Sequence, residues 1–142
     1  MTSIPDYMTA KHRDCDEVFT LAEASVAKGN WELAAESWQQ FKDELLTHFS
    51  QEEDTLFPAF EQATGMTGGP TQVMRMEHQQ MRSLVTDLEQ AMSEQNKDSF
   101  LGLSETLMVM MQQHNMKEEM MLYPMMAKNL PQGDEIIASF SA

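Results

Sequence analysis

The sequence consists of two similar halves offset by 66 residues, and this repeat strongly limits the folds that the chain can adopt. The only four histidines form two pairs with the same 36-residue spacing, His12 with His48 and His78 with His114. The second histidine of each pair begins the motif His-x3-Glu-Glu-x2-Leu-[Phe/Tyr]-Pro. A chain built this way is expected to form the same structural unit twice.

Apolar residues recur in steps of three and four through four segments, which is typical of helices with one buried face. The histidines occupy positions within these apolar stripes. The first and third stripes are related by the same 66-residue shift at all six positions. The four stripes are Met8, His12, Cys15, Phe19, Ala22 and Val26; Trp31, Trp38, Phe41, Leu45, His48 and Glu52; Met74, His78, Met81, Val85, Leu88 and Met92; and Leu103, Leu107, Met110/Met111, His114, Glu118 and Met121/Leu122.

Helix-breaking and capping residues predict where these helices begin and end. The second helix is expected to end around Ala63, and Pro58 can kink its last part because proline removes a backbone hydrogen bond. Pro70 opens the third helix. Asp98 is a plausible N-cap for the fourth helix.

Four amphipathic helices joined by short loops predict an all-α, up-down-up-down four-helix bundle. The bundle is expected over about residues 5–129, with a short helical tail at 130–142. The length of 142 residues suits a single domain.

Composition excludes several classes of partner. The formal net charge of −14 disfavours nucleic acids and anionic membranes. No apolar run approaches the roughly 18 residues of a transmembrane helix, and the first residues lack the features of a signal peptide. A single cysteine, Cys15, excludes an internal disulfide, so a reducing cytoplasm is the default expectation. A monomer or weak dimer is expected.

The spacing of the histidines and glutamates predicts a buried metal site. Residues at i and i+4 share a helix face, so His48 can point to the same place as Glu52, and His114 to the same place as Glu118. The distances along the helices from each tight turn then bring His12 level with His48, and His78 level with His114. Buried carboxylates without a counter-charge are costly, and bound cations remove that cost. Two metals, each with two histidines and sharing both glutamates, satisfy the set; iron suits it, with manganese or zinc as alternatives.

Purely structural roles for these residues are less favourable. A single inward histidine is usually a hydrogen-bonded core residue, and a His-x3-Glu pair usually lies on the surface. Here all four histidines replace core positions at matched heights, in duplicate. The residues Glu53 and Glu119 that follow the glutamates are predicted to be solvated or to accept hydrogen bonds from histidine N–H groups.

The pattern resembles the hemerythrin-like domains, also called HHE cation-binding domains, over about residues 8 to 126. The residues that carry the resemblance are His12, His48-x3-Glu52 with Glu53 and Leu56-Phe57-Pro58, Glu77-His78, and His114-x3-Glu118 with Leu122-Tyr123-Pro124. The resemblance implies two iron ions with bridging carboxylates and an oxo or hydroxo bridge. It assigns His12 and His48 to one iron, His78 and His114 to the other, and Glu52 and Glu118 to the bridges.

One position departs from the oxygen-carrying hemerythrins, which are similar but place a further histidine four residues before the one that matches His78. This chain has Met74 there, and Met8 at the repeat-related position. We interpret both as apolar lids, because a thioether is a poor ligand for ferric iron. The resulting six-ligand site looks more like those of di-iron iron–sulfur repair proteins and iron-sensing domains.

The leading hypothesis is a di-iron protein that binds oxygen or nitric oxide for sensing, storage or detoxification. The alternative is iron handling, in iron–sulfur cluster repair or iron sensing. A peroxidase- or catalase-like activity ranks last, because no separate acid–base group stands beside the ligands, and no catalytic residue is assigned.

The remaining reactive or oxidisable residues are interpreted mainly as packing residues. Cys15 is predicted to be a small core residue rather than a redox group. Phe57 and Tyr123 are also predicted to be core residues, and the alternative that a tyrosine near iron handles radicals ranks below this. The methionines crowded in the fourth helix are predicted to fill the core, with Met116 and Met120 facing outward.

Overall fold

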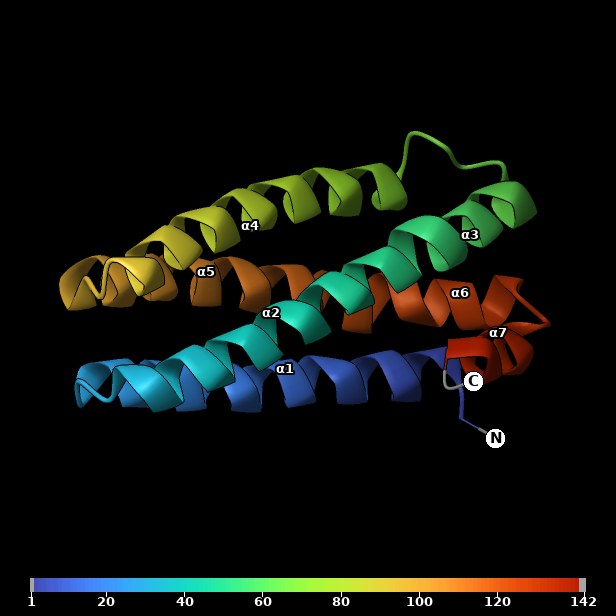
Figure 1. The fold of residues 1–142 in the computed structure, drawn as a ribbon. Helices are drawn as coiled ribbons and strands as arrows, with labels where there is room; N and C mark the ends of the chain where they lie inside the picture. Colours follow the sequence, from blue (N-terminus) through green and yellow to red (C-terminus); the bar gives the residue numbers. More distant parts are fainter. Residues whose placement is uncertain (1, 141–142) are drawn as a thin grey trace.

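The computed structural model describes residues 2–140, and these form helices with no strand (Figure 1). The predicted all-α fold is therefore confirmed. Residues 1 and 141–142, which belong to the predicted domain and its tail, lie outside the described part. The elements in chain order are α1 (Ile4–Ala27), α2 (Trp31–Gln51), η1 (Glu52–Leu56), α3 (Phe57–Thr64), α4 (Pro70–Ser93), α5 (Lys97–Lys117), η2 (Glu118–Leu122), α6 (Tyr123–Asn129) and α7 (Gly133–Phe140).

The helices form two antiparallel hairpins that pack into an up-down-up-down bundle. In Figure 1, α2, η1 and α3 follow one another as one long rod, and α5, η2 and α6 form a second rod. Helix α1 packs against α2 and α5, and α4 packs against α5 and α2. The 65–69 loop and both ends of the chain lie at the opposite end of the bundle from the two tight turns. The tail helix α7, which the sequence predicted, packs against α1.

The two tight turns repeat the same backbone design. After α1, Gly29 has a φ of 74°, and after α4, Gln95 takes a similar left-handed φ of 52°. Asn30 then caps α2 through its side chain, and Asn96 caps α5 by accepting from the Ser99 N–H at 3.1 Å. The prediction of Asp98 as the N-cap was therefore wrong. Asp98 lies in the first turn of α5, where its negative charge suits the helix dipole.

The prolines of the two motifs are accommodated by π-helical turns rather than by a break. In η1 the Phe57 N–H bonds to the Glu52 carbonyl, and in η2 the Tyr123 N–H bonds to the Glu118 carbonyl. Such i→i+5 bonds widen the helix just before a proline, which has no N–H and clashes with the carbonyl four residues earlier. The long rods therefore continue through the prolines. The second one begins at Lys97, and the first ends at Thr64, one residue past the predicted end.

Two apolar clusters fill the bundle, one on each side of the histidine level. The larger lies toward the tight turns and includes Phe19, Phe41 and Leu88. The smaller lies toward the chain ends and includes Met8 and Phe60. Because the bundle is packed on both sides of the histidines, they lie in a layer that is largely closed to solvent.

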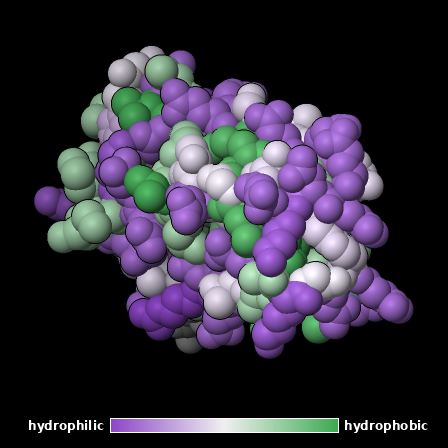
Figure 2. All heavy atoms as spheres, turned by 90° about the vertical axis from the view of Figure 1, so that its left-hand side faces the viewer, coloured by the Kyte–Doolittle hydropathy of each residue, from purple (hydrophilic) through white to green (hydrophobic). Residues whose placement is uncertain are grey.

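The predicted stripes are buried almost throughout, with exceptions mainly in α5 and η2. Leu103 and Met110 are half-buried and Met121 is exposed, whereas the adjacent alternatives Met111 and Leu122 are buried. Met116 and Met120 face solvent as predicted. Hydrophilic side chains dominate the surface at the tight-turn end, with hydrophobic atoms showing between them (Figure 2). Among residues 2–140, no helix has both the length and the apolar character required to cross a bilayer.

Candidate metal centre

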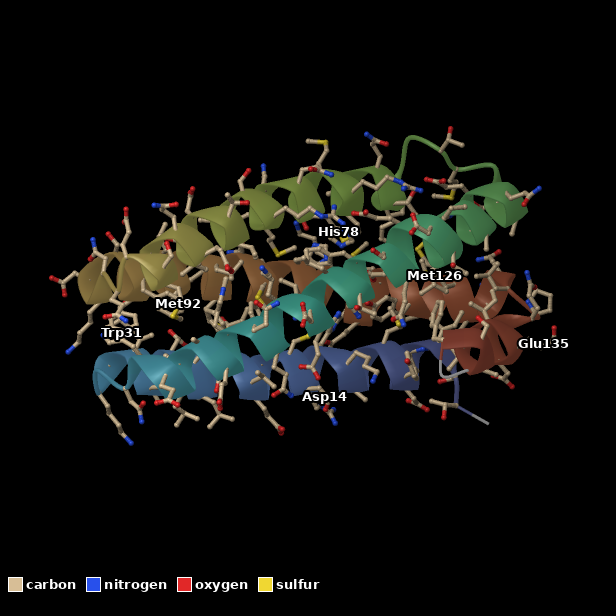
Figure 3. The ribbon with its side chains drawn as sticks, in the orientation of Figure 1. Asp14, Trp31, His78, Met92, Met126 and Glu135 are labelled. Carbon is tan, nitrogen blue, oxygen red and sulfur yellow. The ribbon has the colours of Figure 1, made fainter. Side chains whose placement is uncertain are left out.

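The structure brings the four histidines and two glutamates into one buried cluster. His12, His48, His78 and His114 come from α1, α2, α4 and α5, and each is at most 5% exposed. Figure 3 shows His78 extending from α4 toward the interior of the bundle. Glu52 and Glu118 are fully buried at the first positions of η1 and η2.

The donor atoms fall into two overlapping groups, each compact enough for one metal ion. One group contains Glu52, His78, His114 and Glu118, and the other contains His12, His48 and Glu118. The Oε1 atom of Glu118 lies 3.1 Å from His12 Nε2 and 3.3 Å from His114 Nε2. Glu118 therefore lies between the two groups, as a bridging carboxylate would.

Glu52 contacts histidines of both halves less evenly. Its Oε1 lies 3.1 Å from His78 Nε2 and 3.6 Å from His48 Nε2. The two histidines of the first hairpin are themselves close, with 3.1 Å between the Nε2 atoms of His12 and His48. The predicted matching of heights within each hairpin is confirmed by these contacts and by the 4.9 Å between the ring centroids of His78 and His114.

Three of the four histidines hydrogen-bond to a carboxylate through Nδ1. His12 pairs with Glu119 at 2.7 Å, His78 with Glu53 at 2.6 Å, and His114 with Glu77 at 2.8 Å. Because a carboxylate only accepts, each Nδ1 donates, and each Nε2 directs a lone pair at the cluster. The predicted role of Glu53 and Glu119 as acceptors is confirmed, and Glu77 adds a third.

Cations further support two of these carboxylates. Arg82 donates to both oxygens of Glu53 at 2.8 and 2.9 Å, and Lys117 pairs with Glu77. Burial alone would raise the pKa of Glu53, but hydrogen bonds from Arg82 and His78 outweigh it and hold that pKa below its usual value. Glu53 is therefore held ionised beside His78.

The electrostatics of the metal-free cluster favour the neutral form of two imidazoles, those of His48 and His78. Burial lowers the pKa of His48 to about 3 and that of His78 to about 4. Burial also opposes the charged form of His114, but the nearby Glu118 carboxylate raises its pKa overall. Burial and repulsion from Glu118 raise the pKa of Glu52 well above its usual value. The cluster thus resists carrying its full negative charge without added cations.

Whether a metal fits can be tested by asking which buried side-chain atoms lack a partner. Several carboxylate oxygens and imidazole nitrogens of the cluster have no hydrogen-bond partner within residues 2–140. They include Glu52 Oε1, Glu118 Oε2 and the Nε2 atoms of His78 and His114. Leaving such atoms unpaired costs about 1–3 kcal/mol each. Convergent imidazole nitrogens and carboxylate oxygens suit non-haem iron and related divalent ions. The residues therefore fit a metal centre.

Tyr123 contributes to the cluster in a way that the sequence did not reveal. It is buried, as predicted, but its hydroxyl donates to Glu52 Oε2 at 2.6 Å and lies 2.9 Å from Glu118 Oε1. Burial and these two carboxylates raise the pKa of the Tyr123 hydroxyl well above its usual value. Its repeat counterpart Phe57 is buried in the smaller apolar cluster. The Phe/Tyr difference between the two motifs was the available signal.

The two methionines predicted as apolar lids are buried in the smaller apolar cluster. Met8 and Met74 pack there together with Leu56, Phe57 and Tyr123. Cys15 is buried in the larger cluster, as predicted for a small core residue, and burial raises the pKa of its thiol to about 12.

A cleft of about 290 Å³ between α1 and α2 reaches the first hairpin's half of the cluster. Its lining includes His48 and Cys15, together with the acidic residues Asp14, Asp43 and Glu44. Two buried atoms in this region, His48 Nδ1 and Glu44 Oε2, have no hydrogen-bond partner within the described chain. His48 therefore lacks the carboxylate partner that the other three histidines have.

Comparison with known families agrees with the fold and the cluster. Residues 3–126 match the hemerythrin HHE cation binding domain, so the chain belongs to that family and carries a metal-binding site of histidines and glutamates. No curated protein and no solved structure matches the chain.

Proposed function

We propose that the protein binds two iron ions through His12, His48, Glu52, His78, His114 and Glu118, and uses them to bind oxygen or nitric oxide. The observation that carries this proposal is the convergence of buried, unpartnered imidazole nitrogens and carboxylate oxygens on one place. Glu118 belongs to both donor groups, which supports a bridge between two ions. Bound ferrous iron supplies the electrons and the coordination positions with which a diatomic ligand binds.

The chain supplies a suitable environment for such a ligand. The apolar clusters on both sides restrict the access of water to the layer of the histidines. The carboxylates of Glu53, Glu77 and Glu119 fix three imidazole rings with their Nε2 lone pairs toward the cluster. Sensing, storage or detoxification of the diatomic ligand are all compatible with this arrangement.

The test is anaerobic reconstitution with ferrous iron, followed by elemental analysis and addition of oxygen or nitric oxide. We expect two irons per chain and a change in the visible spectrum with at least one of the gases. Iron binding without any spectral response to either gas would refute the ligand-binding proposal and leave only the metal site.

One observation favours the alternative function in iron handling. The lining of the cleft that reaches His48 has one cation, Lys11, and three acidic side chains, so its net charge attracts cations; the acidic residues are Asp14, Asp43 and Glu44. In a competition experiment with a chelator, iron handling predicts rapid loss of one iron, slowed in an Asp43→Asn variant. An exposed acidic residue away from the cleft, Asp87, provides the control through Asp87→Asn. Equal rates in all three proteins would refute this path for iron.

We also propose that residues 1–142 act as one domain. This proposal is supported by the packing of α7 against α1. Gly133 also lies so close to Ile4 that a Cβ added to the glycine would be 3.1 Å from the Ile4 side chain. Limited proteolysis is expected to leave the tail attached. Early cleavage between α6 and α7 that leaves an intact bundle would contradict it.

A further inference from the structure

We propose that Tyr123 is a seventh protein ligand, with its hydroxyl oxygen bound to the same metal ion as His12 and His48. This inference rests on the metal centre proposed above and adds a chemical difference between its two halves. Elsewhere in the bundle, the exposed methionines of α5 and η2 offer nothing that identifies a partner.

The position of the Tyr123 oxygen is that of a ligand atom. It lies 2.6 Å from Glu52 Oε2, 2.9 Å from Glu118 Oε1, 3.1 Å from His12 Nε2 and 3.4 Å from His48 Nε2. Ligand atoms sit about 2 Å from a metal, so two of them at right angles lie about 3 Å apart. The Tyr123 oxygen keeps this spacing from four donor atoms at once.

Hydrogen bonding alone does not account for these contacts. A tyrosine hydroxyl has one proton to donate. Glu52 and Glu118 present acceptor oxygens to it, and His12 presents an Nε2 lone pair because its Nδ1 donates to Glu119. The single proton can form a good hydrogen bond with only one of these acceptors. The lone pairs of the other acceptors then face the tyrosine oxygen, which also carries lone pairs. A cation within the group converts the crowded lone pairs into favourable contacts.

Coordination also has a simple proton balance. The O–H bond of Tyr123 breaks, the oxygen–metal bond forms, and the proton passes to solvent, as happens when other protein ligands bind metals. No oxidant or reductant is required. The phenolate adds one negative charge to the two carboxylates, which suits two multiply charged cations.

The repeat makes the assignment specific to one half of the centre. Phe57 stands in the position of Tyr123 in the first motif and has no oxygen to offer. The metal ion held by His78 and His114 therefore lacks this ligand. The chain has only one other tyrosine, Tyr7, which lies in contact distance of Phe140 at a ring separation of 6.1 Å, outside the cluster.

The test is visible and resonance Raman spectroscopy of the ferric protein with its iron content measured. Ferric ions bound to phenolate absorb visible light through charge transfer, and excitation in that band enhances the ring vibrations of the tyrosine. We expect both signals in the wild type and in Tyr7→Phe, and their loss in Tyr123→Phe with iron still bound. Ring-deuterated tyrosine in the Tyr7→Phe protein is expected to shift the enhanced vibrations, which tests Tyr123 without altering it.

The outcomes separate this inference from the proposed function. Two ferric ions per chain without phenolate vibrations in the wild type overturn the tyrosine ligand but leave the metal centre intact. The same conclusion holds if the Tyr123→Phe variant keeps the charge-transfer band and the enhanced ring vibrations. Absence of bound iron in the wild type refutes the proposed function and this inference together.

Discussion

The pair Glu53 and Glu119 allows stability to be separated from metal binding. Both carboxylates accept a hydrogen bond from a histidine of the cluster, at 2.6 Å for Glu53 and 2.7 Å for Glu119. Of the two, Glu53 also forms a bidentate ion pair with Arg82. Replacing each carboxylate by its amide isolates the contribution of that ion pair.

The magnitude follows from the contacts and their exposure. Hydrogen bonds to charged groups contribute about 1.5–3 kcal/mol each when well shielded. Arg82 is 28% exposed, so water can partly replace its lost partner, and the penalty of a fully buried broken pair does not apply. We expect Glu53→Gln to cost about 2 kcal/mol in the metal-free protein, or a fall in Tm of roughly 6–10 °C at this size. Glu119 is 34% exposed and has no Lys or Arg partner within residues 2–140, so Glu119→Gln should cost under about 1 kcal/mol.

Metal affinity is expected to respond differently. Each glutamine can still accept from the histidine Nδ1–H, but without the negative charge that increases the basicity of the ring. Changes of this kind lower metal affinity by about 10–100-fold, so both variants should fall in that range. Urea denaturation of the metal-free proteins and chelator competition of the loaded ones measure the two effects. Equal stability losses for the two variants would refute the ion-pair reasoning, and unchanged affinities would refute the role in histidine basicity.

Three other changes test different parts of the structure. His48→Ala and Glu118→Ala should each lower both the iron content and the thermal stability of the iron-loaded protein. Each removes a candidate metal ligand, and Glu118 also belongs to both ligand groups. An unchanged iron-to-protein ratio by elemental analysis would contradict the assignment. Phe41→Ala, in the larger apolar cluster, should cost about 3–5 kcal/mol in urea denaturation while iron stoichiometry stays the same. Cys15, with a pKa of about 12 against 9.0 for a free thiol, should react with iodoacetamide at pH 8 roughly a thousandfold more slowly in the folded than in the unfolded chain. Because that pKa is raised in the folded state, its contribution to stability should be lost as pH rises from 9 toward 12, and fast labelling of native protein would contradict its burial.

The bundle and the ligand cluster could be predicted because both depend on regular helix geometry. A buried helix face repeats every three to four residues, and the four histidines lie in these stripes. A tight turn halfway between two histidines brings them to one level, as His12 and His48 show with 3.1 Å between their Nε2 atoms. These relations require only the rise and the periodicity of an α-helix.

The contribution of Tyr123 could not be predicted, because it depends on a departure from that geometry. In a regular α-helix, residues five apart point about 140° away from one another, so Tyr123 and Glu118 would not share a face. The π-turn η2 joins them through an i→i+5 hydrogen bond and places one above the other. The hydroxyl of Tyr123 then lies 2.9 Å from the Glu118 carboxylate. A prediction based on 3.6 residues per turn assigns this tyrosine to the core alone.

The cap of α5 was missed for a different reason. Asp98 and Asn96 are both good capping residues, and local preference does not choose between them. The repeat distinguishes the two candidates, because Asn96 corresponds to Asn30. Each asparagine caps its helix directly after a residue in the left-handed conformation. Extending the 66-residue comparison from the ligands to the turns would have identified the correct residue.

The same comparison shows that the surroundings of the ligands are not repeated. Glu77, which accepts from His114, corresponds to Lys11 in the first half, and His48 Nδ1 accordingly has no carboxylate partner in the described part of the chain. The tyrosine hydroxyl is present only on the side of His12 and His48. In the proposed two-metal centre, two imidazoles made more basic by carboxylates would therefore face one metal position, whereas one such imidazole and a tyrosine oxygen would face the other. Through two unrepeated positions, the proposed ligand set of four histidines and two glutamates would thus form a centre whose two metal sites differ in chemistry.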